Sequence, residues 1–141
     1  ESYNLENLSK KFKKDNSSVV IFGCGLWGKL VLYNLQLHGI EVNYFIDSNK
    51  KLLGKYYLGI KTISPDELAK SSPDAHIFVA HKWLNVAIEL LNKLNFKNIY
   101  NIVGLLKSID FSKKIHSDKL NLHLEPLKLE RDIKNFNYNL I

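Results

Sequence analysis

The chain has 141 residues, a length that fits one domain with a single core and leaves little room for a second one. Its content of 45% apolar and 24% charged residues is ordinary for a soluble globular protein. No apolar run approaches the roughly 18 to 20 residues of a membrane helix, so we expect no membrane span. The lysines behind the net charge of +6 are dispersed and form no basic and aromatic ladder, so we expect no nucleic-acid partner.

The cysteine and methionine content predicts the compartment of the protein and indicates that the chain is part of a longer enzyme. A single cysteine, Cys24, excludes an internal disulfide framework, and no secretory signal pattern begins the chain, so we expect a cytoplasmic protein. Methionine is absent even from position 1, which indicates a processed or excised piece of a longer enzyme. A missing flanking domain or a second copy of the chain is then an expected partner.

The predicted elements alternate between helix and strand. The polar segment 1–17 has apolar residues at helical spacing, which predicts a short amphipathic helix. The β-branched run Val19–Phe22 predicts a strand buried on both faces. A helix is predicted from Lys29 to a glycine cap at Gly39, and a second strand over Val42–Ile46.

The same alternation continues to about residue 102. Ser64, Pro65 and Glu67 form a capping box that starts a helix, and Asn85–Leu94 is an amphipathic helix with Val86, Leu90 and Leu94 on one face. The remaining strands are predicted at Gly59–Ile63, His76–Ala80 and Asn98–Ile102. This pattern predicts an α/β fold with a mostly parallel five-stranded sheet in the order 3-2-1-4-5.

The domain organisation follows from where this pattern begins and ends. We expect a helical, polar segment over residues 1–17, a core domain over 18–107 and a C-terminal extension over 108–141. The extension breaks the strand and helix alternation, and its stretch Leu127–Phe136 is compatible with a helix. It is expected to pack on the core domain, on a second copy or on a missing neighbour.

A glycine-rich turn, Gly23-Cys24-Gly25-Leu26-Trp27-Gly28, follows the first predicted strand. In such a turn the first glycine permits the sharp bend, the second lets a pyrophosphate approach the backbone, and the third lets the helix pack on the strand. Asp47, 19 residues after Gly28, ends the second strand and is placed to accept hydrogen bonds from ribose hydroxyls. Together these features predict a three-layer Rossmann-like fold that binds a nucleotide. If the ligand is a dinucleotide, NAD is favoured over NADP, because an acidic residue disfavours a 2′-phosphate.

Further residues complete the predicted site. Ser48 follows Asp47, and Ala80 and His81 end the fourth strand, at the edge where open α/β sheets bind ligands. His81 is a candidate acid or base and Lys82 a candidate phosphate partner, with a loop role for His81 left open. No other catalytic residue is assigned.

Several features are set aside or left open. Cys24 fits tight packing within the turn, with a reactive thiol as the alternative, and Trp27 could shape or partly occlude a pyrophosphate site. The spacing of Tyr57 and Lys61 matches a short-chain dehydrogenase pair, but a glycine interrupts it in a predicted loop and strand. The histidines show no metal-ligand spacing, so no metal is predicted.

The resemblance to a known group of proteins rests on a set of motifs: Val20–Gly28, Tyr44–Ser48, Gly54, Gly59–Ile60, Ile63–Leu68 and Ile77–Ala80. From Val19 to about Leu106 the chain resembles a Rossmann-like domain common in bacterial surface-polysaccharide enzymes. Such domains stand in front of sugar acyltransferases, occur in nucleotide-sugar dehydratases and are attached to sugar methyltransferases. The resemblance implies binding of NAD or a nucleotide-sugar. It transfers no catalytic residue, because the chain lacks the further domains that those enzymes use.

The leading hypothesis is therefore a nucleotide-binding module for NAD or a nucleotide-sugar, working in carbohydrate or cell-envelope polysaccharide biosynthesis. One alternative is a small stand-alone NAD-dependent oxidoreductase that acts on a nucleotide-sugar through His81 or Lys82. Another is an S-adenosylmethionine-binding domain, or an interaction domain of a methyltransferase whose nucleotide site is vestigial.

Overall fold

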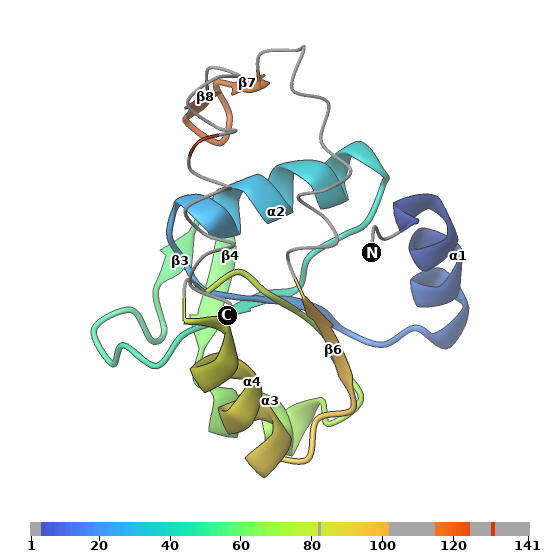
Figure 1. The fold of residues 1–141 in the computed structure, drawn as a ribbon, viewed down its shortest axis with the longest axis vertical. Helices are drawn as coiled ribbons and strands as arrows, with labels where there is room; N and C mark the ends of the chain where they lie inside the picture. Colours follow the sequence, from blue (N-terminus) through green and yellow to red (C-terminus); the bar gives the residue numbers. More distant parts are fainter. Residues whose placement is uncertain (1–3, 82, 102–114, 125–130, 132–141) are drawn as a thin grey trace.

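The computed structural model describes residues 4–81, 83–101, 115–124 and 131 (Figure 1). The fold is α/β, with helices on both faces of a six-stranded sheet in the order β3-β4-β2-β1-β5-β6. In chain order the elements are α1 (Leu5–Asp15), β1 (Val19–Phe22), α2 (Leu26–Leu37), β2 (Tyr44–Ile46), β3 (Tyr56–Tyr57), β4 (Ile60–Ile63), α3 (Pro65–Ser71), β5 (His76–Val79), α4 (Leu84–Lys93), β6 (Asn98–Asn101), β7 (Ile115–Ser117) and β8 (Leu122–Leu124).

The sheet confirms the predicted α/β class and differs from the prediction by one strand. The five predicted strands are β1, β2, β4, β5 and β6, and they pair in parallel in the predicted order. The sixth, β3, pairs antiparallel with β4 at the edge of the sheet. The prediction of five strands was wrong because β3 has two residues, too few to show an alternating pattern.

Burial on both faces explains why the central strands are continuously apolar. In β1, Val19 and Ile21 pack in the core beneath α1 and α2, whereas Val20 and Phe22 pack in the core beneath α3 and α4. Figure 1 shows α2 on one side of the sheet and α3 and α4 on the other. The parallel strands are thus covered on both faces, as in other doubly wound sheets.

The helix that follows the glycine turn begins earlier than predicted. Its first residue is Leu26, and Gly25 is the N-cap, so Trp27 and Gly28 lie within α2. At the other end, Gly39 has a φ of +70°, which confirms the predicted glycine cap. The predicted start at Lys29 was wrong because the glycine motif contributes the first turn of the helix.

The inward face of α4 also differs from the prediction. Of the three residues placed on the apolar face, Leu90 and Leu94 are partly buried against the core beneath α3 and α4, but Val86 is 66% exposed. The buried residues are Leu84, Ala87 and Leu91, which form a neighbouring row of the same helix. Both rows are apolar, and the row with the small Ala87 side chain allows the closer approach to the sheet. By contrast, the predicted start of α3 is confirmed in its N-cap, since the backbone N–H of Glu67 donates to Ser64 Oγ at 3.1 Å and Pro65 is the first helical residue.

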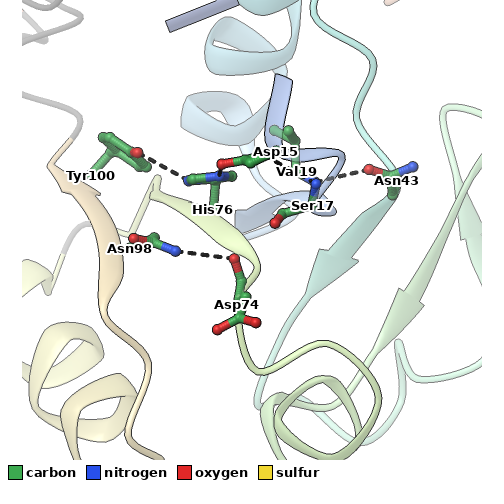
Figure 2. A network of polar contacts seen from close by, with 8 residues as sticks. All are labelled: Asp15, Ser17, Val19, Asn43, Asp74, His76, Asn98 and Tyr100. Atoms are coloured by element: carbon green, nitrogen blue, oxygen red, sulfur yellow. Dashed lines mark hydrogen bonds and ion pairs between the residues drawn. The ribbon is translucent and has the colours of Figure 1, made fainter. Parts of the chain in front are cut away.

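A polar network fastens α1 to the amino-terminal edge of the sheet (Figure 2). His76, at the start of β5, is 1% exposed, and both of its ring nitrogens have partners. Nε2 lies 2.8 Å from Asp15 Oδ2, at the end of α1, and Nδ1 lies 3.0 Å from the Tyr100 hydroxyl in β6. The Phe12 ring covers the imidazole at a centroid distance of 4.3 Å. The buried imidazole of β5 is thereby satisfied by two elements, α1 and β6, that lie far from it in the sequence.

Beyond β6, the described residues form a small antiparallel hairpin, β7–β8, that lies beyond α2 in Figure 1. Leu120 and Leu122 are buried and belong to the hydrophobic cluster that also contains the core residues of α1 and α2. The stretch Leu127–Phe136 lies outside the described residues except for Arg131. No helix within the described ranges combines the length and apolar composition needed to cross a bilayer.

Candidate functional site

Three parallel strands end side by side at the carboxyl edge of the sheet. The backbone N–H of Gly23, after β1, donates to the Ile46 carbonyl at the end of β2, at 3.0 Å. The N–H of Ala80, after β5, donates to the Phe22 carbonyl at 2.9 Å. The glycine turn, Asp47 and Ala80 are therefore brought to one edge, which is where parallel α/β sheets bind their ligands.

Packing requires two of the three glycines of the turn. Gly23 has a φ of +118°, and a Cβ there would lie 2.9 Å from the carbonyl oxygen of Ala80. A Cβ on Gly28 would lie 2.1 Å from the carbonyl oxygen of Gly23, so the helix can approach the turn only with glycine at this position. The packing therefore explains why both positions are occupied by glycine, as the motif predicts.

Gly25 differs from the other two glycines. Its φ of −93° is accessible to any residue, and a Cβ there would meet no atom of the described residues within 4 Å. As the N-cap of α2 it supplies no side chain to the amides of the first turn, which contains no acidic residue. No side chain at the N-cap or in the first turn thus offsets the positive end of the α2 dipole, which favours a negative charge there.

The other residues of the turn pack against the protein. Cys24 and Trp27 are half-buried and contact the core beneath α1 and α2, while Leu26 is 43% exposed. Burial raises the pKa of the Cys24 thiol to about 11; the nearby Asp47 carboxylate adds to the rise and the Thr62 hydroxyl opposes it. The thiol is thus protonated at neutral pH, which favours the packing role over the reactive one.

Asp47 is half-buried at the end of β2 and shapes the loop after it. Its Oδ1 accepts the backbone N–H of Asn49 at 2.9 Å, and Asn49 Oδ1 accepts the N–H of Lys51 at 3.0 Å. These two consecutive Asx turns fix the direction in which the chain leaves the strand. Ser48, between the two side chains, is exposed.

The loop after β5 holds the remaining predicted residues. Ala80 is buried, and the half-buried His81 ring lies edge-on to Phe22 at a centroid distance of 5.9 Å. His81 Nδ1 accepts the backbone N–H of Trp83 at 3.0 Å, so the imidazole helps to shape the turn that leads into α4. Lys82 lies outside the described residues.

A pocket of about 410 Å³ joins the glycine turn to the edge of the sheet. Of the predicted site residues, it contains Cys24, Gly25 and Asp47. The rest of its lining comes from the loop after β2 and from the β3–β4 pair, namely Asn49, Leu52, Lys55, Tyr56, Tyr57 and Thr62. These β3 and β4 residues are not among the predicted site residues, because the two residues of β3 are too few to show a strand pattern in the sequence.

The tyrosine and lysine that match a dehydrogenase pair lie on two different strands. Tyr57 is in β3 and pairs with Ile60, while the exposed Lys61 is in β4 opposite Tyr56. They share no helical face, so the structure agrees with setting this spacing aside. Within the residues that the structure describes, no three His, Cys, Asp or Glu side chains gather as metal ligands would.

The strand order, the glycine turn and an acidic residue after β2 define a Rossmann-like domain. The chain belongs to the C2185-like, N-terminal family, whose match covers residues 15–90, more than half of the 141 residues. A search of curated proteins found no matching sequence.

Several solved structures are similar to the chain. The Rex-family repressor RSP aligns with a TM-score of 0.50 and 19% identity, over 95% of this chain and 64% of the repressor. RSP in complex with β-NADH aligns with a TM-score of 0.44 and 18% identity, over 98% of this chain and 71% of that one. The UDP-D-quinovosamine 4-dehydrogenase from Vibrio fischeri aligns with a TM-score of 0.47 and 22% identity, over 74% of this chain and 97% of the dehydrogenase. The first of these likenesses shows a shared fold.

Proposed function

We propose that this domain binds a nucleotide, NAD or a nucleotide-sugar, at the carboxyl edge of its sheet. The observation that carries the proposal is the contrast among the three glycines. The fold requires Gly23 and Gly28, but neither the backbone nor the packing requires Gly25. A glycine at an open helix N-cap is explained when a phosphate approaches the backbone at that point.

Asp47 supplies the second part of the site. It lies in the same pocket as Gly25, so a ligand whose phosphate meets the start of α2 can place its ribose at the carboxylate. Ribose hydroxyls donating to Asp47 favour a ligand without a 2′-phosphate.

The domain is a module that positions this ligand for a larger enzyme of carbohydrate or cell-envelope polysaccharide biosynthesis in the cytoplasm. Its C-terminal extension, residues 108–141, contacts the core domain or a partner, and burial of Leu120 and Leu122 supports this role.

Calorimetric titration of the full chain with NAD, NADP, a uridine diphosphate-sugar and S-adenosylmethionine tests the proposal. We expect saturable binding of NAD or the uridine diphosphate-sugar, and a loss of about 1 to 3 kcal/mol in Asp47→Ala from the missing charged hydrogen bonds. Asp66→Ala, in the first turn of α3, is a matched carboxylate control outside the pocket. Binding of S-adenosylmethionine alone, or no binding by any ligand at millimolar concentration, contradicts the proposal.

A further inference from the structure

The pocket beyond Asp47 exists because no helix covers this part of the sheet. Residues 47–59 connect β2 to β4 through turns and the short β3, without a helix between the two parallel strands. The loop and β3 instead wall a hollow on the face that α2 covers elsewhere, where Tyr57 packs edge-on against Phe45 at 5.3 Å. The pocket therefore extends away from the β1–β5 crevice, where His81 lies, and toward the β3 edge.

One wall of this pocket carries an exposed aromatic ring. Tyr56 is 71% exposed, although β3 pairs with β4 and holds its backbone in place. The neighbouring Tyr57 side chain is half-buried against the core, and this packing anchors the strand that carries Tyr56. A large ring displayed from a paired strand at the mouth of a pocket is a preorganised stacking surface.

The floor of the pocket holds a buried hydroxyl with a weak partner. Thr62, in β4, is 1% exposed, and the side-chain partner of its hydroxyl is the Cys24 thiol at 3.8 Å. A thiol is a weak donor and a weak acceptor, whereas buried hydroxyls ordinarily have a full hydrogen bond. A polar ligand atom entering the pocket would supply the stronger partner.

From these observations we infer that the base of a nucleoside 5′-diphosphate enters this pocket, stacks on Tyr56 and hydrogen-bonds to Thr62. The inference rests on the proposed function and deepens it. Gly25, Asp47 and Tyr56 line one continuous pocket, so phosphate, ribose and base meet them as parts of one ligand. Its volume of about 410 Å³ is within the range of small-molecule sites. NAD and nucleotide-sugars both contain a nucleoside 5′-diphosphate, so either can be the source.

The test compares ligands with and without a base on two variants of the full chain. Adenosine diphosphate, uridine diphosphate and ribose 5-phosphate are titrated into the wild type, Tyr56→Ala and Tyr56→Phe. Loss of the stacking ring in Tyr56→Ala should weaken both nucleoside diphosphates on the order of tenfold to a hundredfold. Ribose 5-phosphate should bind the wild type and Tyr56→Ala equally, and Tyr56→Phe should retain the wild-type affinities.

Lys61→Ala is the matched control, because Lys61 is the exposed cross-strand partner of Tyr56 and is absent from the pocket lining. It should leave all three affinities unchanged. If the wild type prefers adenosine diphosphate, the bound nucleoside diphosphate belongs to the dinucleotide. If it prefers uridine diphosphate, it belongs to the nucleotide-sugar. Wild-type binding that Tyr56→Ala does not weaken overturns the base pocket and leaves the proposed function standing. A wild type that binds neither diphosphate overturns both.

Discussion

The amino-terminal ends and the carboxyl ends of the parallel strands form two opposite edges of the central sheet. These two edges differ in how their polar groups are satisfied. At the amino-terminal edge, both nitrogens of the buried His76 are bonded, and the Asn43 side chain accepts the Val19 amide at 2.8 Å (Figure 2). At the carboxyl edge, a Cβ on Gly25 would meet no described atom within 4 Å, and the buried Thr62 hydroxyl has only a thiol as partner among the described side chains. At the amino-terminal ends of the strands the buried polar groups are bonded within the protein, whereas at the carboxyl ends a buried hydroxyl has only a weak partner among the described side chains.

This difference separates residues that hold the fold from residues that are free to serve a ligand. The glycine turn contains both kinds within six positions, since Gly23 and Gly28 serve packing and Gly25 does not. Substitutions at the two edges, and within the turn, can therefore test which kind each residue is.

The largest effect is expected for Gly28→Ala. Its methyl group would lie 2.1 Å from a backbone carbonyl oxygen, so α2 or the turn must shift. We expect a loss of about 3 kcal/mol or more, seen as a fall of about 10 °C or more in the thermal midpoint or as a failure to fold. Gly25→Ala is the matched control, with a change of less than about 1 kcal/mol. Equal midpoints for the two variants contradict the assigned packing roles.

Cys24 should react slowly for a half-exposed thiol. Its pKa of about 11, against the ordinary 9.0, lowers the thiolate fraction at pH 8 by about a hundredfold. Alkylation by iodoacetamide should be slower by a similar factor than in the urea-denatured chain, which is the control. Because the folded pKa is the higher one, the folded state also loses stability as the pH rises from 9 toward 11. Equal alkylation rates in the two states would show an active thiolate.

The smallest of these effects is expected at the amino-terminal edge. Asp15→Ala leaves the buried Nε2 of His76 without its acceptor, which should cost about 1 to 3 kcal/mol in urea unfolding at pH 7. The control, Glu89→Ala, breaks an exposed 3.5 Å ion pair with Lys93 and should cost about 0.5 kcal/mol or less. Similar losses in both variants would show that the His76 network is no stronger than a surface pair.

The same substitution has a predictable pH dependence. Burial of the Asp15 carboxyl acts to raise its pKa, but hydrogen bonds from the Ser17 amide and His76, together with the charge of Lys11, hold the pKa below its ordinary 3.8. A lowered folded-state pKa stabilises the fold above the unfolded-state value, and that stability is lost as the pH falls through the folded-state value. The difference in stability between wild type and Asp15→Ala should therefore narrow below about pH 4. A stability difference between the two proteins that stays constant down to pH 2 would contradict the lowered pKa of Asp15.

Local patterns predicted the parts of the fold that local physics determines. Apolar runs located five strands, and the right-handedness of crossovers predicted their order, which the sheet confirms. Periodicity alone could not choose between the two apolar rows of α4, because the choice depends on how closely Ala87 lets the helix approach the sheet. The His76 network could not be predicted, since Asp15 and Tyr100 lie 61 and 24 residues away along the chain.

The candidate site was predictable to a similar extent. The glycine motif and its spacing to Asp47 located one end of the pocket from sequence alone. The other end depends on β3, whose two residues acquire a strand conformation only by pairing with β4. Tyr56 and Thr62 are brought to the site by that pairing, so a pattern read along the chain does not identify them.

The most direct test of nucleotide binding at the glycine turn is the dissociation constant of NAD and of a uridine diphosphate-sugar for Gly25→Val. A Cβ at position 25 meets no described atom within 4 Å, so we expect the thermal midpoint of this variant to stay within about 3 °C of the wild type. The larger side chain would fill the place of the phosphate at the start of α2, so affinity should fall tenfold or more, by about 1.4 kcal/mol. An unchanged dissociation constant in the folded variant would contradict phosphate binding at this turn.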